Sequence, residues 1–174
     1  MRDWRLGFSI TNLQSPVLRM VDVLLIGYGN PLRGDDGIGW VVVEKMLERE
    51  TATSALLNAG VSLHTISQHQ LLPEHAEPIS QAKLVIFVDA AVGEVPGTIQ
   101  CASLQPVPPQ PGAFTHHLTP SGLLAMARDV LGRCPPAFLC TITGADFEFN
   151  EEISPLLQRK LPELLEKIGE IMIG

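Results

Sequence analysis

The sequence lacks the features that mark several common classes of protein. It has no basic cluster, and its 19 acidic residues outnumber its 12 basic ones, which gives a formal net charge of -7. A nucleic-acid groove or an anionic membrane surface would require the opposite sign, so neither is expected as a partner. No stretch approaches the roughly 18 consecutive apolar residues that a membrane-spanning helix needs.

Cysteine is also scarce, and the three cysteines have no spacing typical of a metal site. Cys140 lies in an apolar run and is expected in the core, whereas Cys101 and Cys134 have no evident role. An odd number of cysteines without a ligand pattern favours reduced thiols and a cytoplasmic location. The motifs HExxH, CxxC and GxSxG are missing as well, and the missing serine motif disfavours a serine peptidase.

The first twenty residues show no regular spacing of apolar side chains. They carry charges throughout and lack a continuous apolar run, which argues against a signal peptide. Regular patterning begins at Val21, directly after Met20. We therefore expect residues 1–19 to form an arm that contributes little to the core, although an arm packed on the surface fits equally well. Residues 20–174 have the length of one α/β domain.

Apolar runs alternate with helical patterns along the rest of the chain. Strands are expected where Val, Ile and Leu concentrate, at residues 21–28, 61–67, 84–90, 98–104 and 137–143. Helical spacing follows Asp36, covers 121–131 and resumes at Pro155, and Pro162 should kink or restart that last helix. This alternation predicts a doubly wound, three-layer α/β fold with a mostly parallel sheet.

Ligands of such folds bind at the carboxyl ends of the strands, where the winding of the sheet reverses. A common strand order places 21–28 and 84–90 side by side at this reversal. The loops that follow these two strands, 29–37 and 89–93, would then face one crevice. Both loops bring carboxylates into the crevice.

The loop after the first strand lies in the segment GYGNPLRGDDGIG, residues 27–39, and resembles a phosphate-binding loop with the wrong charge. Leu32 stands where a dinucleotide-binding fingerprint needs glycine, and no Gly-Lys-Ser/Thr precedes the helix as in a P-loop. Asp35 and Asp36 would repel a pyrophosphate, so nucleotide binding is disfavoured. One of the two aspartates should cap the following helix, but capping requires only one of them.

Three loops of the predicted fold offer oxygen or nitrogen ligands. They carry the Asp35–Asp36 pair, Asp89 at the end of an apolar strand, and the doublet His116–His117 before a helix. Two carboxylates and an imidazole suit a cation such as Zn, Ni or Mn. A helix cap, a loop anchor and a surface histidine are the ordinary explanations of the same residues. Their occurrence together favours a metal site.

The three motifs in this order, GYGNPLRGDDGIG, VIFVDAA and THHLTPSGLLAMA, resemble those of the hydrogenase maturation endopeptidases. The resemblance covers nearly the whole chain from Met20 and includes QLLPE at 70–74 and TGADFE at 143–148. It implies a cytoplasmic α/β protein whose twisted five-stranded sheet has helices on both faces. It also implies an endopeptidase that removes the C-terminal extension of a nickel–iron hydrogenase large-subunit precursor after metal insertion.

The resemblance further implies that three residues contact metal and carry the reaction, namely Asp36, Asp89 and His116. Asp36 is the second member of the acidic pair, and the positions of Leu118 and Pro120 favour His116 over His117. The implied metal is a divalent cation, nickel, that the substrate presents, so the resting protein need not hold one.

Two functions from different classes fit these residues. The first is the metal-dependent endopeptidase, whose partner is the precursor. The second is a non-enzymatic checkpoint protein that binds or senses nickel in that precursor without cutting it. A peptidase of the same fold that acts on an unrelated substrate is a third, weaker possibility.

Overall fold

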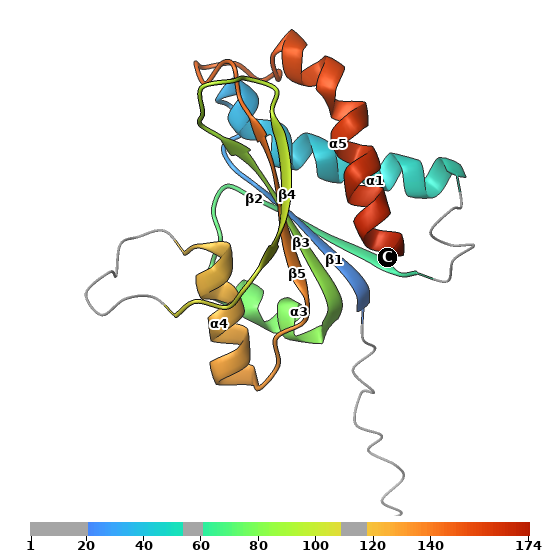
Figure 1. Ribbon diagram of the computed structural model, residues 1–174, viewed down its shortest axis with the longest axis vertical. Coiled ribbons are helices and arrows are strands. Elements are labelled where there is room, and N and C mark those ends of the chain that lie inside the picture. The colour runs from blue at the N-terminus through green and yellow to red at the C-terminus, as the bar shows by residue number, and fades with distance from the viewer. Residues whose placement is uncertain (1–20, 54–60, 109–117) are drawn as a thin grey trace, which may run out of the picture.

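The computed structural model describes residues 21–53, 61–108 and 118–174 (Figure 1). The strands form one sheet in the order β2-β1-β3-β5-β4, in which all neighbours are parallel except the pair β4–β5. This arrangement confirms the mostly parallel five-stranded sheet. The strand bounds are β1 Val21–Tyr28, β2 Leu63–Gln68, β3 Ala82–Ala91, β4 Ile99–Leu104 and β5 Ala137–Thr143. The proposed arm, residues 1–19, lies outside the described residues.

Helices cover both faces of the sheet (Figure 1). Along β1, Val23 and Leu25 pack into the core with α1 (Ile38–Thr53) and α5 (Pro155–Ile173). Leu24 and Ile26 point to the opposite face and pack with α3 (Ala76–Gln81) and α4 (Pro120–Leu131). Because successive strand residues face opposite sides, a strand covered on both faces is apolar throughout. The three-layer prediction is confirmed.

The expected neighbours β1 and β3 do lie side by side, with Gly27 paired to Val88 near their carboxyl ends. The loops after the two strands therefore open on the same edge of the sheet, as predicted. β4 runs antiparallel because residues 92–98, which connect it to β3, are too few for the crossover that a parallel strand needs. Among the helices described, none combines the length and apolar character required to cross a bilayer.

Side-chain caps explain where the two long C-terminal helices begin. The Thr119 hydroxyl accepts a hydrogen bond from the Gly122 N–H (3.1 Å) at the start of α4, and the Ser154 hydroxyl accepts one from the Leu157 N–H (3.3 Å) at the start of α5. α5 continues as one helix through Pro162, so the predicted restart at that residue is wrong. Pro162 is exposed, and water can replace the backbone hydrogen bond that proline removes there.

The helical segment between β2 and β3 was not predicted. It consists of the short 3-10 helix η2 (Pro73–His75) followed directly by α3. His75 is 5% exposed, and its Nδ1 accepts a hydrogen bond from the Leu72 N–H (3.1 Å). Burial lowers the pKa of this imidazole, so it is held neutral as a structural acceptor.

Cys101 and Cys140 form a disulfide between β4 and β5. The antiparallel register places the two residues directly opposite each other, which their linear spacing in the sequence does not reveal. The expectation of reduced cysteines is therefore wrong for this pair. Cys140 is buried as expected, and Cys134 is a free thiol.

Loss of the Cys101–Cys140 disulfide should lower the free energy of unfolding by about 2–4 kcal/mol, because the cross-link closes a long loop in the unfolded chain. Urea unfolding with and without a reductant would measure the difference. The Cys134→Ser variant should show the same difference as the wild type, because Cys134 is not part of the disulfide. Equal stability of the oxidised and reduced proteins would show that the cross-link contributes nothing.

Candidate functional site

The start of α1 lies unusually close to the carboxyl ends of β1 and β3. The 3-10 helix η1 (Gly34–Gly37) leads into α1, and a β-carbon at Gly39 would come within 2.6–2.8 Å of backbone atoms of Tyr28 and Val88. Gly29 has a φ of 127°, and a β-carbon there would collide with the carbonyl oxygen of Asp36. Only glycine permits this approach, which brings Asp36 to the edge of the sheet.

Asp36 is partly buried and is fixed by the backbone of the preceding loop. Its Oδ2 accepts a hydrogen bond from the Asn30 N–H (2.8 Å), while the Asn30 side chain accepts one from the Leu32 N–H (3.0 Å). The second carboxylate oxygen of Asp36 has no hydrogen-bond partner within the described ranges. This oxygen remains available to an incoming ligand.

Asp89 lies close enough to Asp36 for the two carboxylates to repel each other. Burial, and to a smaller extent the charge of Asp36, raise the pKa of Asp89 to about 6, despite hydrogen bonds from the Tyr28 hydroxyl and the Ala90 N–H that oppose the rise. Burial and the neighbouring Asp89 also raise the pKa of Tyr28, which therefore stays a neutral donor. The two carboxylates therefore repel each other at the carboxyl edge of the sheet, and this repulsion adds to the rise in the pKa of Asp89.

Asp35 has a different role from its neighbour. It is fully buried, and its oxygens accept hydrogen bonds from the N–H groups of Ala145 (2.7 Å), Asp146 (3.0 Å) and Ser154 (2.6 Å). The prediction that one of the paired aspartates caps the following helix is wrong, because these bonds, like that of Asp36, go to loop backbone. Asp35 anchors the loop between β5 and α5 to η1, and no local pattern reveals partners so distant in sequence.

The third predicted ligand, His116, lies with His117 outside the described residues. Residues 118–119, which follow the doublet in the chain, lead into α4. This helix covers the face of the sheet toward which Asp89 points, because Asp89 shares the alternation of Val85 and Phe87. Within the described ranges, no group of three or more His, Cys, Asp or Glu residues forms a cluster able to hold a metal ion. Of the three predicted ligands, the structure describes Asp36 and Asp89, and the charge of Asp36 acts on the carboxyl of Asp89.

Two aromatic residues at this edge were not predicted. Tyr28 contacts Asp89, and strand alternation could have placed both side chains on one face, because β1 and β3 were expected to be neighbours. The indole N–H of Trp40 donates to the Gly29 carbonyl (3.0 Å), and its ring meets the exposed His69 edge-on with the ring centroids 5.7 Å apart. Trp40 therefore supports the loop that carries Asp36.

Comparison with known proteins tests the resemblance that the sequence motifs indicate. A curated protein of Methanocaldococcus jannaschii, named "putative hydrogenase maturation protease", is 28% identical over 160 residues, which are 90% of this chain and 97% of that protein. The chain is therefore similar to a protein named as a hydrogenase maturation protease. The resemblance of the motifs is confirmed, although no family model matches the chain.

Solved structures of hydrogenase maturation proteases share the fold. The hydrogenase maturating endopeptidase HybD of Escherichia coli superimposes with a TM-score of 0.63 at 19% identity, covering 85% of this chain and 90% of HybD. The [NiFe] hydrogenase maturation protease HycI of Thermococcus kodakarensis gives a TM-score of 0.62 at 23% identity, covering 89% and 94%. The α/β architecture of this chain is thus that of the maturation proteases.

Replacement of Asp35 by alanine should destabilise the protein strongly. The substitution leaves three N–H groups of the β5–α5 loop without their acceptor, and each buried unsatisfied group costs about 1–3 kcal/mol. Urea unfolding should show a loss of about 3 kcal/mol or more, whereas Glu148→Ala at an exposed position should change stability by less than about 0.5 kcal/mol. If Asp35→Ala and Glu148→Ala had similar free energies of unfolding, Asp35 would not anchor the loop.

The raised pKa of Asp89 predicts a pH dependence of stability in the metal-free protein. The folded-state pKa of about 6 exceeds the unfolded value of 3.8, so the folded protein binds the Asp89 proton more tightly than the unfolded chain does. The contribution of this proton to the free energy of unfolding is therefore full below about pH 4 and is lost as the pH rises through 6. The difference in unfolding free energy between wild type and Asp89→Asn should therefore change by about 2 kcal/mol between pH 4 and 8. Titration of the Asp89 carboxyl carbon by NMR would give the pKa directly, and a value near 4 would oppose this account.

Proposed function

We propose that this chain is a metal-dependent endopeptidase that removes the C-terminal extension of a nickel–iron hydrogenase large-subunit precursor after metal insertion. The observation that carries the proposal is the approach of Asp36 and Asp89 at the carboxyl edge of β1 and β3, in a chain related to hydrogenase maturation proteases. This edge, next to the point where the winding of the sheet reverses, is where α/β folds bind ligands.

The residues present fit a divalent cation. Asp36 has one carboxylate oxygen without a hydrogen-bond partner among the described residues, and Asp89 is partly buried beside a like charge. A cation between them would relieve the repulsion and favour both charged forms. His116 would supply the third ligand. In our proposal this cation is the nickel of the precursor, so that the substrate completes the site.

The surrounding residues have supporting roles in this proposal. A divalent cation at the site would polarise a peptide carbonyl or activate water. Tyr28 orients Asp89 through its hydroxyl, and Asn30 orients Asp36 through its backbone N–H. Asp35 holds the neighbouring loop, since it is fully buried and its oxygens accept three backbone hydrogen bonds.

The precursor is the proposed partner and the cytoplasm the proposed compartment, both on the resemblance to the maturation endopeptidases, since the Cys101–Cys140 disulfide removes the argument from reduced cysteines. The described residues contain no helix able to span a membrane. The concentration of acidic residues in the loops at the site makes nucleic acid an unsuitable ligand.

Substitution of each proposed ligand should stop cleavage of the nickel-loaded precursor. His116→Ala, Asp36→Asn and Asp89→Asn should each lower the rate by about 100-fold or more, because an imidazole or a negative charge on the cation is lost. His117→Ala should retain measurable cleavage, since adjacent side chains point in different directions. Mass spectrometry of the precursor after incubation measures the products, and circular dichroism verifies the fold of each variant.

The outcomes of this experiment separate the proposed functions. Loss of cleavage in His117→Ala with normal cleavage in His116→Ala would show that His117, and not His116, is the histidine ligand. Wild-type protein that binds the nickel-loaded precursor without releasing a fragment would identify a checkpoint protein. Failure to bind the precursor in any form would point to a peptidase with an unrelated substrate.

A further inference from the structure

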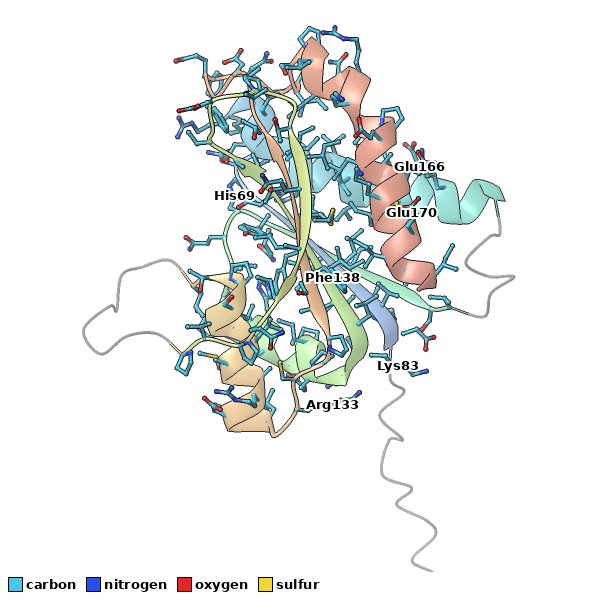
Figure 2. The ribbon with its side chains drawn as sticks, in the orientation of Figure 1. His69, Lys83, Arg133, Phe138, Glu166 and Glu170 are labelled. Atoms are coloured by element: carbon cyan, nitrogen blue, oxygen red, sulfur yellow. A yellow bond between two sulfur atoms is a disulfide. The ribbon has the colours of Figure 1, made fainter. Side chains whose placement is uncertain are left out.

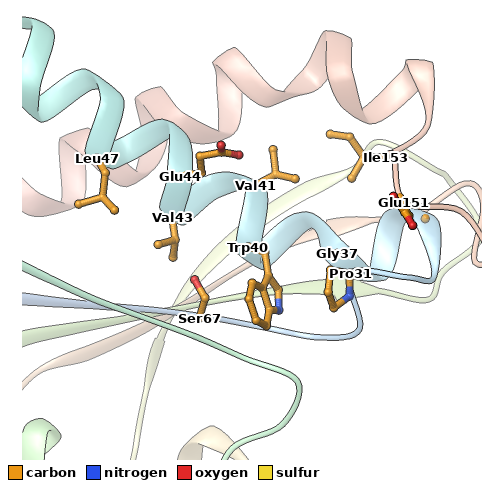
Figure 3. A pocket seen from close by; sticks show the side chains of 11 residues that line it. Pro31, Gly37, Trp40, Val41, Val43, Glu44, Leu47, Ser67, Glu151 and Ile153 are labelled. Carbon is orange, nitrogen blue, oxygen red and sulfur yellow. The ribbon is translucent and has the colours of Figure 1, made fainter.

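A cavity of about 450 Å³ lies along α1 on the flank of the loop that carries Asp36 (Figure 3). We call it the α1 groove. Its walls come from α1, η1, the end of β2 and the segment that precedes α5. The side chains that line it are mostly apolar and include Pro31, Trp40, Val41, Leu47 and Ile153. The volume is within the range of clefts that bind ligands.

Two carboxylates, Glu44 and Glu151, interrupt this apolar lining. Both side chains belong to exposed residues, and none of the ion pairs among the described residues involves either of them. The nearby Lys45 pairs with Glu48 on the next turn (2.8 Å). An indole beside unpaired carboxylates and aliphatic side chains suits the apolar stem and cationic head of lysine or arginine.

The loops that border the α1 groove strengthen its negative potential. Residues 29–37 and 144–154 together contain six acidic residues and a single basic one, Arg33. The Arg33 guanidinium donates to the carbonyl of Phe147 (3.2 Å), which holds it in place within these loops. A basic segment would therefore be attracted to this side of the molecule, whereas an acidic one would be repelled.

The groove adjoins the proposed active site. Gly34 and Gly37 line the groove, and Asp36 lies between them in η1. Trp40 both lines the groove and donates to Gly29, the residue packed against the Asp36 backbone. A polypeptide that lies in the groove would therefore pass beside η1, the segment that carries Asp36.

We propose that the α1 groove is a docking site for a segment of the precursor that carries a lysine or arginine beside an apolar residue. This inference rests on the proposed function, since it names the part of the substrate that the protein recognises apart from the metal. The groove contributes affinity and register for the precursor, while Asp36 and Asp89 serve the metal.

Reversal of the groove charges tests this proposal through the cleavage kinetics of the nickel-loaded precursor. The double variant Glu44→Lys/Glu151→Lys should raise KM about tenfold and leave kcat within twofold, because the lost attraction and new repulsion act on binding. The matched control is Glu166→Lys/Glu170→Lys on α5, which changes the net charge equally away from the groove (Figure 2). The control should change KM less than twofold.

Trp40 provides a second readout that does not require cleavage. In a Trp4→Phe background it is the only tryptophan of the chain, so its fluorescence reports on the groove. Addition of the nickel-loaded precursor should change this fluorescence, and the titration should show about tenfold weaker binding by the Glu44→Lys/Glu151→Lys protein. The affinity of the wild-type groove should also fall as the salt concentration rises.

Several outcomes would overturn the docking proposal. Equal KM values for the groove variant and the α5 control would refute it while leaving the peptidase function intact. A fluorescence response to protein concentration without precursor would show that a second copy occupies the groove. Tighter precursor binding by Arg2→Glu/Arg5→Glu would show that the N-terminal segment of the same chain occupies it. Charge-dependent binding of precursor without cleavage would support the groove and refute the peptidase.

Discussion

The close approach of α1 to the ends of β1 and β3 is the constraint on which the candidate site depends. Gly39 leaves room for the backbones of Tyr28 and Val88, and Gly29 leaves room for the carbonyl of Asp36. A side chain at either glycine would push the helix away from the sheet and would separate Asp36 from Asp89. Backbone packing therefore sets the position of Asp36 relative to the end of β3, where Asp89 lies.

The fold was largely predictable because its determinants are local. Strands buried on both faces are continuously apolar, and the Ser154–Pro155 pair marks the start of α5 by capping chemistry. The elements that escaped prediction have weak or non-local signals. α3 spans only Ala76–Gln81 and has no apolar stripe, and the pairing of Cys101 with Cys140 depends on the register of β4 against β5.

The site was predictable in part for the same reason. Asp36 follows β1 and Asp89 lies near the carboxyl end of β3, and the pattern of the chain identifies both strands, so the topology places both residues at one edge. The division of roles between Asp35 and Asp36 could not be inferred, because it depends on amide groups more than a hundred residues away. The contact of Tyr28 with Asp89 requires both the strand order and the direction of each side chain.

The distant partners of Asp35 also impose an order on the assembly of the protein during synthesis. Ala145, Asp146 and Ser154 follow Asp35 by 110–119 residues, so the amino-terminal half of the chain leaves the ribosome long before they exist. β1, β2 and β3 can pair at that stage, but the acidic loop acquires its anchor only when the segment before α5 is made. A chain that ends before Ala145 therefore lacks all three partners of Asp35 and leaves the acidic loop without this anchor.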